Sequence, residues 1–148
     1  MMLIQILIIL KNSRKGGNKN GAMKKVIHSE KAPKPLGVYS QGVVAGGFIF
    51  VSGQLPIDPQ TNRFVEQDIK KQTRQVFKNI EQILAAEGAG LKDIVKISAF
   101  LFNLDDFQGM NEVFQEFFAD HFPARTTSTV KAFPQGVLVE IDAIASKK

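Results

Sequence analysis

Two short stretches decide the fold: FPARTTSTV at residues 122–130 and VEIDAIA at residues 139–145. Both are rich in β-branched residues and alternate with a period of two, which predicts two strands. Each carries a charge where strands prefer none, Arg125 at the start of the first and Glu140 inside the second. A guanidinium matches the two oxygens of a carboxylate, and a glutamate can orient or deprotonate a water. The same residue types also fit two structural roles, a surface charge at Arg125 and an edge charge at Glu140 that blocks unwanted strand pairing.

The rest of the chain predicts two amphipathic helices and four more strands. One helix is expected from a cap at Asp68 to about Glu87 and the other from Asp106 to about His121, each with one apolar stripe. Gly109 lies inside the second helix, where glycine lowers helix stability. The remaining strands are expected at residues 24–29, 41–45, 48–52 and 94–102, with Gly46-Gly47 as a hairpin turn and residues 56–62 as a loop.

This order of elements predicts an α+β domain of two layers, in which two helices pack on one face of a mixed sheet. The opposite face of such a sheet is left bare and favours a partner. On this strand, expected at residues 125–132, alternation places Thr127, Thr129 and Lys131 on the same face as Arg125. Arg125 and Thr127 are therefore expected to address one ligand.

Composition narrows the classes of function. The chain has 148 residues, of which 44% are hydrophobic and 22% charged, as in an ordinary one-domain globular protein. It has no cysteine, which excludes disulfides, thiolate metal sites and a cysteine nucleophile. Its two histidines, His28 and His121, lie far apart in the sequence, so we expect no metal site.

Most of the net charge of +5 comes from the first 22 residues. They hold four basic residues and no acid, and the remaining residues, 23–148, hold 15 basic and 14 acidic residues, a net charge of +1. This balance argues against nucleic acid as a partner. The apolar run at residues 1–10 is shorter than the roughly 20 residues that span a bilayer, and its charges follow it rather than precede it as in a signal peptide. We interpret residues 1–22 as an upstream extension, either disordered or a mis-assigned start, and residues 23–148 as a single domain without a membrane partner.

Four motifs in a fixed order carry a family resemblance. They are GVYSQG at residues 37–42, VSGQLPIDP at 51–59, NLDDF at 103–107 leading to NEVF at 111–114, and the two stretches quoted first. From about Met23 to the C-terminus the chain resembles the Rid family, the YjgF-like reactive intermediate deaminases that act on enamines and imines. The resemblance implies a chorismate-mutase-like layout, a homotrimer with pockets between subunits, and a cytoplasmic location.

The resemblance also implies site residues. Arg125 would hold the substrate carboxylate, Glu140 would orient the attacking water, and Tyr39 would cover the pocket from a neighbouring subunit. Relatives often carry proline before this tyrosine, where this chain has Val38, and cysteine where it has Thr127, whose expected service is a main-chain contact that threonine can supply. Further residues expected to line the pocket are Ser52, Gly53 and Asn111.

The implied reaction is cofactor-free hydrolysis of 2-imino or 2-enamino acids, such as 2-iminobutanoate and 2-iminopropanoate, to 2-oxo acids and ammonia, a form of metabolite damage control. The single arginine and a small pocket suggest short substrates. Three other functions stay open: a regulatory module that binds 2-oxo acids without catalysis, an RNA-directed endoribonuclease or translation inhibitor, and a chaperone-like or structural role.

Overall fold

The computed structural model describes residues 23–148, so the expectations for residues 1–22 lie outside the described part of the chain. The described elements are β1 (Lys25–Ile27), β2 (Gly42–Ala45), β3 (Phe48–Gln54), β4 (Ile57–Asp58), β5 (Arg63–Phe64), α2 (Ile69–Ala85), the 3₁₀ turn η1 (Leu91–Asp93), β6 (Ile94–Leu101), the 3₁₀ turn η2 (Leu104–Asp106), α3 (Phe107–Phe118), β7 (Ala124–Thr129) and β8 (Val139–Ser146).

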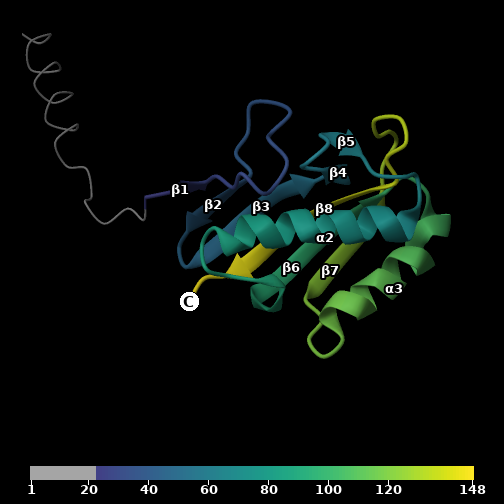
Figure 1. Cartoon of the computed structure of the whole chain (residues 1–148). Helices are drawn as coiled ribbons and strands as arrows, with labels where there is room; N and C mark the ends of the chain where they lie inside the picture. The colour runs from purple at the N-terminus through teal and green to yellow at the C-terminus, as the bar shows by residue number, and fades with distance from the viewer. Residues whose placement is uncertain (1–22) are drawn as a thin grey trace, which may run out of the picture.

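Six strands form one mixed sheet in the order β1-β2-β3-β8-β6-β7. Neighbouring strands are antiparallel except β6 and β7, which are parallel because α3 crosses over between them. Helices α2 and α3 both lie on one face of this sheet (Figure 1). This arrangement confirms the α+β, two-layer architecture expected from the order of elements. Within residues 23–148, no helix is long and apolar enough to cross a membrane.

The turn and cap signals are confirmed. Gly46 and Gly47 have φ values of 57° and 80°, the left-handed conformation that a two-residue hairpin turn requires. The Asp68 side chain accepts a hydrogen bond from the Lys71 amide at 2.8 Å and caps α2. Asn103 accepts a hydrogen bond from the Asp105 amide at 3.0 Å and caps the 3₁₀ turn that precedes α3.

Several expected boundaries are wrong by a few residues. Helix α2 ends at Ala85, before the expected Glu87. The chain turns at Gly88, whose φ is positive, and the Ala89 amide then donates a hydrogen bond back to the Leu84 carbonyl. Strand β7 ends at Thr129, not at residue 132, because the Val130 amide makes the last bond to β6. The same shortening applies to the ends of α3 and of the first strand.

Residues 56–62, expected to be a plain loop, contain most of a small hairpin. Strands β4 and β5 pair as a separate two-stranded sheet. The turn between them depends on Asp58, which accepts a hydrogen bond from the Gln60 amide, and on Asn62, whose φ is 56°. The strands have two residues each, too few for any periodicity to predict them.

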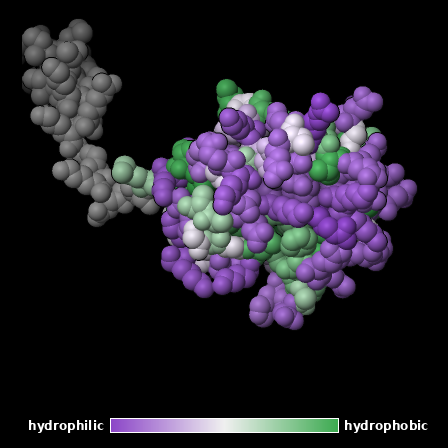
Figure 2. Space-filling view, viewed as in Figure 1, coloured by the Kyte–Doolittle hydropathy of each residue, from purple (hydrophilic) through white to green (hydrophobic). Residues whose placement is uncertain are grey.

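The core lies between the helices and the sheet. Phe77 of α2 is fully buried, and its ring centroid lies 5.0 Å from that of Phe114 and 5.3 Å from that of Phe118, both on α3. Gly109 allows the two helices to approach, because a Cβ at this position would lie 2.6 Å from Ile69 Cγ2. The glycine that lowers helix propensity is therefore required by the packing. Figure 2 shows that the outer surface of the helix layer is mainly hydrophilic.

The other face of the sheet has no helix over it. A row of apolar residues crosses it from strand to strand, since Val26 pairs with Val43, Val43 with Phe50, and Phe50 with Ile144. Val26 is 55% exposed and Phe50 40% exposed. We call this surface the open face.

A buried carboxylate ties both ends of the described chain to α2. The Glu87 side chain is 5% exposed and lies 2.8 Å from Lys25 Nζ and 2.6 Å from Lys147 Nζ. The hydrogen bonds from Lys147 and Lys25 hold the pKa of Glu87 below its ordinary value of 4.5. Because the pKa is lower in the folded protein than in the unfolded chain, this carboxylate stabilises the fold above pH 4.5, and the stabilisation is lost as the pH falls through the folded pKa.

Replacing this carboxylate tests the tie. Glu87→Gln is expected to lower the free energy of unfolding by about 1 kcal/mol at pH 7, because one charged partner of two lysines is lost and the lysines are partly exposed. Urea unfolding at one protein concentration measures it, with Glu81→Gln, an exposed position on α2, as the control. The difference from wild type should shrink at pH 3.5, and an equal difference at both pH values would contradict the proposed tie.

Candidate active site

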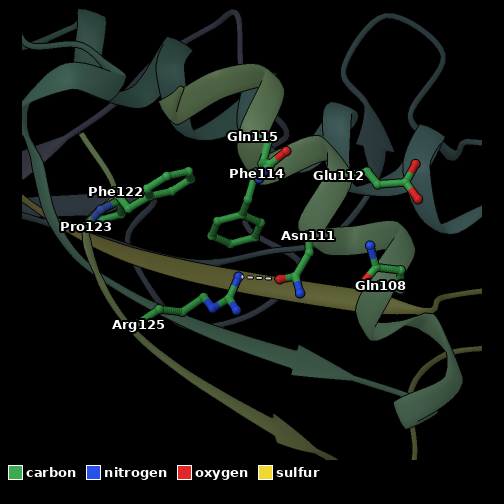
Figure 3. Close-up of a pocket in the computed structure, with 8 residues that line it drawn as sticks. All are labelled: Gln108, Asn111, Glu112, Phe114, Gln115, Phe122, Pro123 and Arg125. Carbon is green, nitrogen blue, oxygen red and sulfur yellow. Dashed lines mark hydrogen bonds between the residues drawn. The ribbon is translucent and has the colours of Figure 1, made fainter. Parts of the chain in front are cut away.

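Arg125 lies on β7 and faces the helices. Its register partner on β6 is Ile97, which is fully buried beneath the helix layer. Arg125 Nη1 donates a hydrogen bond to Asn111 Oδ1 of α3 at 2.8 Å. The guanidinium carbon lies 4.6 Å from the centroid of the Phe114 ring and 5.5 Å from that of Phe107. Figure 3 shows the guanidinium below the Phe114 ring, with the Asn111 amide beside it. Strand pairing and three contacts from one helix therefore fix its place.

This cation has no acidic partner within residues 23–148. The ion pairs of the described chain join other residues. One of them, Arg74 of α2 with Glu116 of α3, is held by two hydrogen bonds. Partial burial lowers the pKa of Arg125, since removal from water disfavours the charged form. The neutral Asn111 amide orients the guanidinium without cancelling its charge. Arg125 is therefore arranged to receive an anion.

A groove of about 540 Å³ opens at Arg125 (Figure 3). One wall is the outer side of α3 and the other is the turn that leads into β7. The lining residues are Gln108, Asn111, Glu112, Phe114, Gln115, Phe122, Pro123 and Arg125. Its volume exceeds that of the small pocket expected from the sequence, so a short ligand would fill only part of the groove within one chain.

Thr127 shares the face of Arg125, as the alternation predicts, because its register partner is the buried Ala99. Its Oγ1 is buried and has no hydrogen-bond partner among the described residues. A buried hydroxyl without a partner destabilises the fold. Arg125, Asn111 and Thr127, which come together at this edge of the helix face, are called the arginine half-site.

Glu140 faces the opposite way. Its register partner on β6 is Phe100, which lies between the buried residues Ala99 and Leu101 and therefore points to the open face. Burial, followed by the nearby charge of Asp142, raises the pKa of Glu140 above its ordinary value. A carboxyl group with a raised pKa exchanges protons more readily near neutral pH, as a general base must.

Gly53 and Ser52 form a bulge beside Glu140. Val51 pairs with Ala143 and Gln54 with Ile141, so Ser52 and Gly53 together oppose Asp142. A side chain at Gly53 would overlap Glu140 Oε1, which shows how closely this carboxylate lies against the Gly53 backbone. Because Gly53 has no Cβ, the Glu140 carboxylate can occupy the space beside its backbone.

Tyr39 belongs to this second group. It shares with Gly53 a narrow pocket of about 20 Å³. The Leu36 amide donates a hydrogen bond to the Tyr39 hydroxyl at 3.0 Å, and the Ser52 hydroxyl donates one to the Ser40 carbonyl at 2.6 Å. Glu140, Gly53, Ser52 and Tyr39 are called the glutamate half-site.

The structure thus sorts the seven residues selected from the sequence into two groups on opposite faces of one sheet. Arg125 and Glu140 cannot hold the same small molecule within one chain, because the sheet lies between them. Within the described residues, no cluster of three histidine, cysteine, aspartate or glutamate side chains could hold a metal ion.

Sequence reasoning missed the aromatic support of Arg125. Phe107 and Phe114 fit the apolar stripe that the sequence predicts for α3. Phe114 packs in the core and also contacts the guanidinium. Helical spacing around Asn111 contained the signal, since residues four before and three after it lie on the same side of a helix. Gln108 and Gln115, which line the groove, lie three residues before and four residues after Asn111, so they also lie on its side of the helix.

The fold and the site together define a class: a two-layer α+β protein with an anion-receiving arginine at the edge of its sheet. The family model described as Endoribonuclease L-PSP matches residues 29–147. The chain therefore belongs to this family, which includes the RutC and Rid proteins, and the resemblance found in the sequence is confirmed.

Relatives and solved structures agree. The chain is 51% identical over 126 residues to a RutC family protein of Pyrococcus horikoshii, covering 85% of this chain and 100% of that protein. It is 39% identical over 121 residues to a protein of Dermatophagoides farinae named 2-iminobutanoate/2-iminopropanoate deaminase, covering 82% and 94%. The crystal structure of Escherichia coli TdcF with bound serine matches with a TM-score of 0.78 and 38% identity, covering 84% of this chain and 99% of that one.

Gly53→Ala tests the contact with Glu140. The added methyl group should push the carboxylate away from the Gly53 backbone toward solvent, so the pKa of Glu140 should fall toward its ordinary value. Carbon-13 NMR titration of the carboxyl groups, assigned with Glu140→Gln, measures this pKa. Gly90→Ala is the control, because a Cβ there meets nothing within 4 Å. An unchanged pKa in Gly53→Ala would show that the bulge does not set the environment of Glu140.

Proposed function

We propose that the protein is a hydrolytic deaminase that converts 2-imino and 2-enamino acids to 2-oxo acids and ammonia. The observation that carries this proposal is Arg125, a surface cation of β7 with no acidic partner among the described residues, which opens on a groove. Relatives named reactive intermediate deaminases support the same chemistry. Candidate substrates are 2-iminobutanoate and 2-iminopropanoate.

Arg125 binds the substrate carboxylate. One Nη1 donor is already directed to Asn111, and the remaining N–H groups are available for a two-point contact with the carboxylate. This charged contact contributes roughly 1.5–3 kcal/mol of binding. The backbone at Thr127, with its unpartnered hydroxyl, positions the carbon that bears the imine nitrogen.

Glu140 activates the water. It accepts a proton from water as the oxygen attacks the C=N carbon, and then gives this proton to the imine nitrogen, which becomes the amine of a carbinolamine. Glu140 next takes the proton of the carbinolamine hydroxyl and returns it to the nitrogen. The C–N bond breaks, ammonia leaves, and the hydroxyl oxygen becomes the 2-oxo group. One water is consumed and no electrons are transferred, so the reaction needs no cofactor. An enamine first tautomerises to the imine. Gly53 and Tyr39 confine this step.

The two half-sites meet in a homotrimer, in which the arginine half-site of one chain faces the glutamate half-site of the next. Two observations support assembly: the half-sites lie on opposite faces of each chain, and the open face carries an apolar row that includes Val26 and Phe50. A closed ring of copies covers such a surface on every chain. We further propose that residues 23–148 act as one domain, in the cytoplasm.

RNA cleavage, which the family description names, has less support. Cleavage by paired acid and base groups commonly uses histidines. The two histidines of this chain are His28, which pairs with Glu30 before the first loop, and His121, which follows α3. The net charge of +1 over residues 23–148 also offers little attraction for phosphates. A module that only binds 2-oxo acids would use Arg125 but would not need Glu140.

Coupled deamination tests the proposal. An amino-acid oxidase generates the imine, and semicarbazide traps what remains. Wild type should suppress trapping, and Arg125→Ala should lower kcat/KM about 10- to 100-fold, because a charged hydrogen bond of the stated size is lost. Arg125→Lys should recover only part, since an ammonium cannot make the two-point contact.

Arg63→Ala, an exposed arginine of β5, is the matched control and should behave as wild type. If folded wild type fails to suppress trapping, the deaminase assignment is wrong, and calorimetric titration with 2-oxobutanoate then distinguishes a binding module.

A further inference from the structure

Four carboxamide side chains are buried in the described chain. Gln54, 5% exposed, donates a hydrogen bond to the Ser52 carbonyl of its own strand, and the other three bind the backbone of more distant segments. Gln41 is 2% exposed, Asn79 1% and Gln72 0%. A neutral carboxamide can satisfy both donors and acceptors of a loop backbone without burying a charge. Two of these residues hold the walls of the narrow pocket that contains Tyr39 and Gly53. Gln41 lines the pocket itself, and Asn79 binds the carbonyls of two other lining residues, Leu55 and Ile57.

Gln41 holds the first wall. Its Oε1 accepts a hydrogen bond from the Ser29 amide at 2.7 Å. Its Nε2 donates to the Ser29 carbonyl at 3.0 Å and to the Pro33 carbonyl at 2.9 Å. Pro33 begins the segment that carries Tyr39, and Gln41 follows Tyr39 by two residues. The loop is thus fastened at both ends by one side chain.

Asn79 holds the second wall from α2. Its Nδ2 donates to the Leu55 carbonyl at 3.2 Å and to the Ile57 carbonyl at 2.9 Å. Gln75 Nε2 donates to Asn79 Oδ1 at 2.9 Å, which fixes the orientation of the amide. Leu55 follows Gly53 by two residues, so these bonds fix the chain directly after the bulge beside Glu140.

The space between the walls is about 20 Å³, room for roughly one water. A displacement of either wall by a fraction of an ångström would therefore change this space completely. Neither wall is held by the main sheet alone. The first lies outside its strands, and the second begins at the end of β3 with Gly53 and Gln54 and continues beyond it to Leu55 and Ile57.

We propose that Gln41 and Asn79 are positioning residues that fix Tyr39 and Gly53 relative to each other, and thereby set the geometry in which Glu140 presents water to the substrate. The catalytic part of this inference rests on the proposed deaminase function. A merely structural role for the two amides would affect stability but neither the environment of Tyr39 nor the ratio of kcat to KM.

The chain contains its own probe of the first wall. Tyr39 is the only tyrosine, and there is no tryptophan, so ultraviolet-excited fluorescence reports on this ring alone. In Gln41→Met and Asn79→Leu, quenching of this fluorescence by acrylamide should rise about twofold, because a released wall exposes the ring more often. Thr73→Val is the matched control, since it removes a buried hydrogen bond of α2 that ends on Ile69 of the same helix.

Kinetics supply the second readout. In both variants kcat should fall about tenfold, a typical result of misplacing a group that acts in the reaction. KM should change less than twofold, because Arg125 on the other half-site binds the carboxylate. Thr73→Val should leave both constants unchanged even where its melting temperature matches that of the variants.

The outcomes separate the claims. Lower melting temperatures with Tyr39 quenching and kcat equal to those of Thr73→Val would overturn the positioning role. If quenching increases in Gln41→Met and Asn79→Leu but the wild-type protein shows no deamination, the two amides fix the walls and the proposed deaminase function is wrong. If Gln41→Met does not fold, Asn79→Ser, which shortens the side chain beyond reach of both carbonyls, carries the same comparison.

Discussion

The alternation of side chains along β-strands is the constraint on which the rest of this structure depends. Strand order places β6 between β7 and β8, and the register along β6 sends Arg125 toward the helices and Glu140 toward the open face. No change of rotamer can bring these two side chains together through a sheet. The helices cover one face only, so Arg125 lies beside α3 and Glu140 lies on the face that no helix covers.

The two half-sites are electrostatically complementary. Arg125 is a cation whose pKa is lowered by burial, and Glu140 is a carboxyl group whose pKa is raised chiefly by burial. Each is destabilised in its charged form by the surroundings it has within one chain. In the reaction that we propose, the substrate brings a carboxylate to Arg125 and an imine to Glu140. Both groups would then be in place before the substrate arrives.

Much of this architecture follows from local patterns in the sequence. The strands at Arg125 and Glu140, the Gly46-Gly47 turn and the cap at Asp68 each depend on neighbours within a few residues, which is why periodicity and turn chemistry predict them. The family motifs select the site residues, and alternation correctly places Thr127 beside Arg125.

The remaining features depend on contacts between distant segments. Gly109 reads as a weak point in a helix until Ile69 of α2 is seen against it. Gly53 reads as a turn residue until the Glu140 carboxylate is found in the space that a Cβ would occupy. The separation of Arg125 and Glu140 onto two faces requires the register of both strands against β6, which no single segment contains. The buried amides of Gln41 and Asn79 likewise have partners more than seven residues away.

Complementation between two inactive variants tests the shared site most directly. Arg125→Ala and Glu140→Gln chains, carrying different tags, are expressed separately and together, and deamination is measured for each preparation. If every site takes its arginine from one chain and its glutamate from another, each variant alone retains only a small fraction of the activity, and random mixing restores about a quarter of the wild-type activity per chain. Activity of the mixture no greater than the sum of the two separate variants would show that the half-sites do not combine between chains.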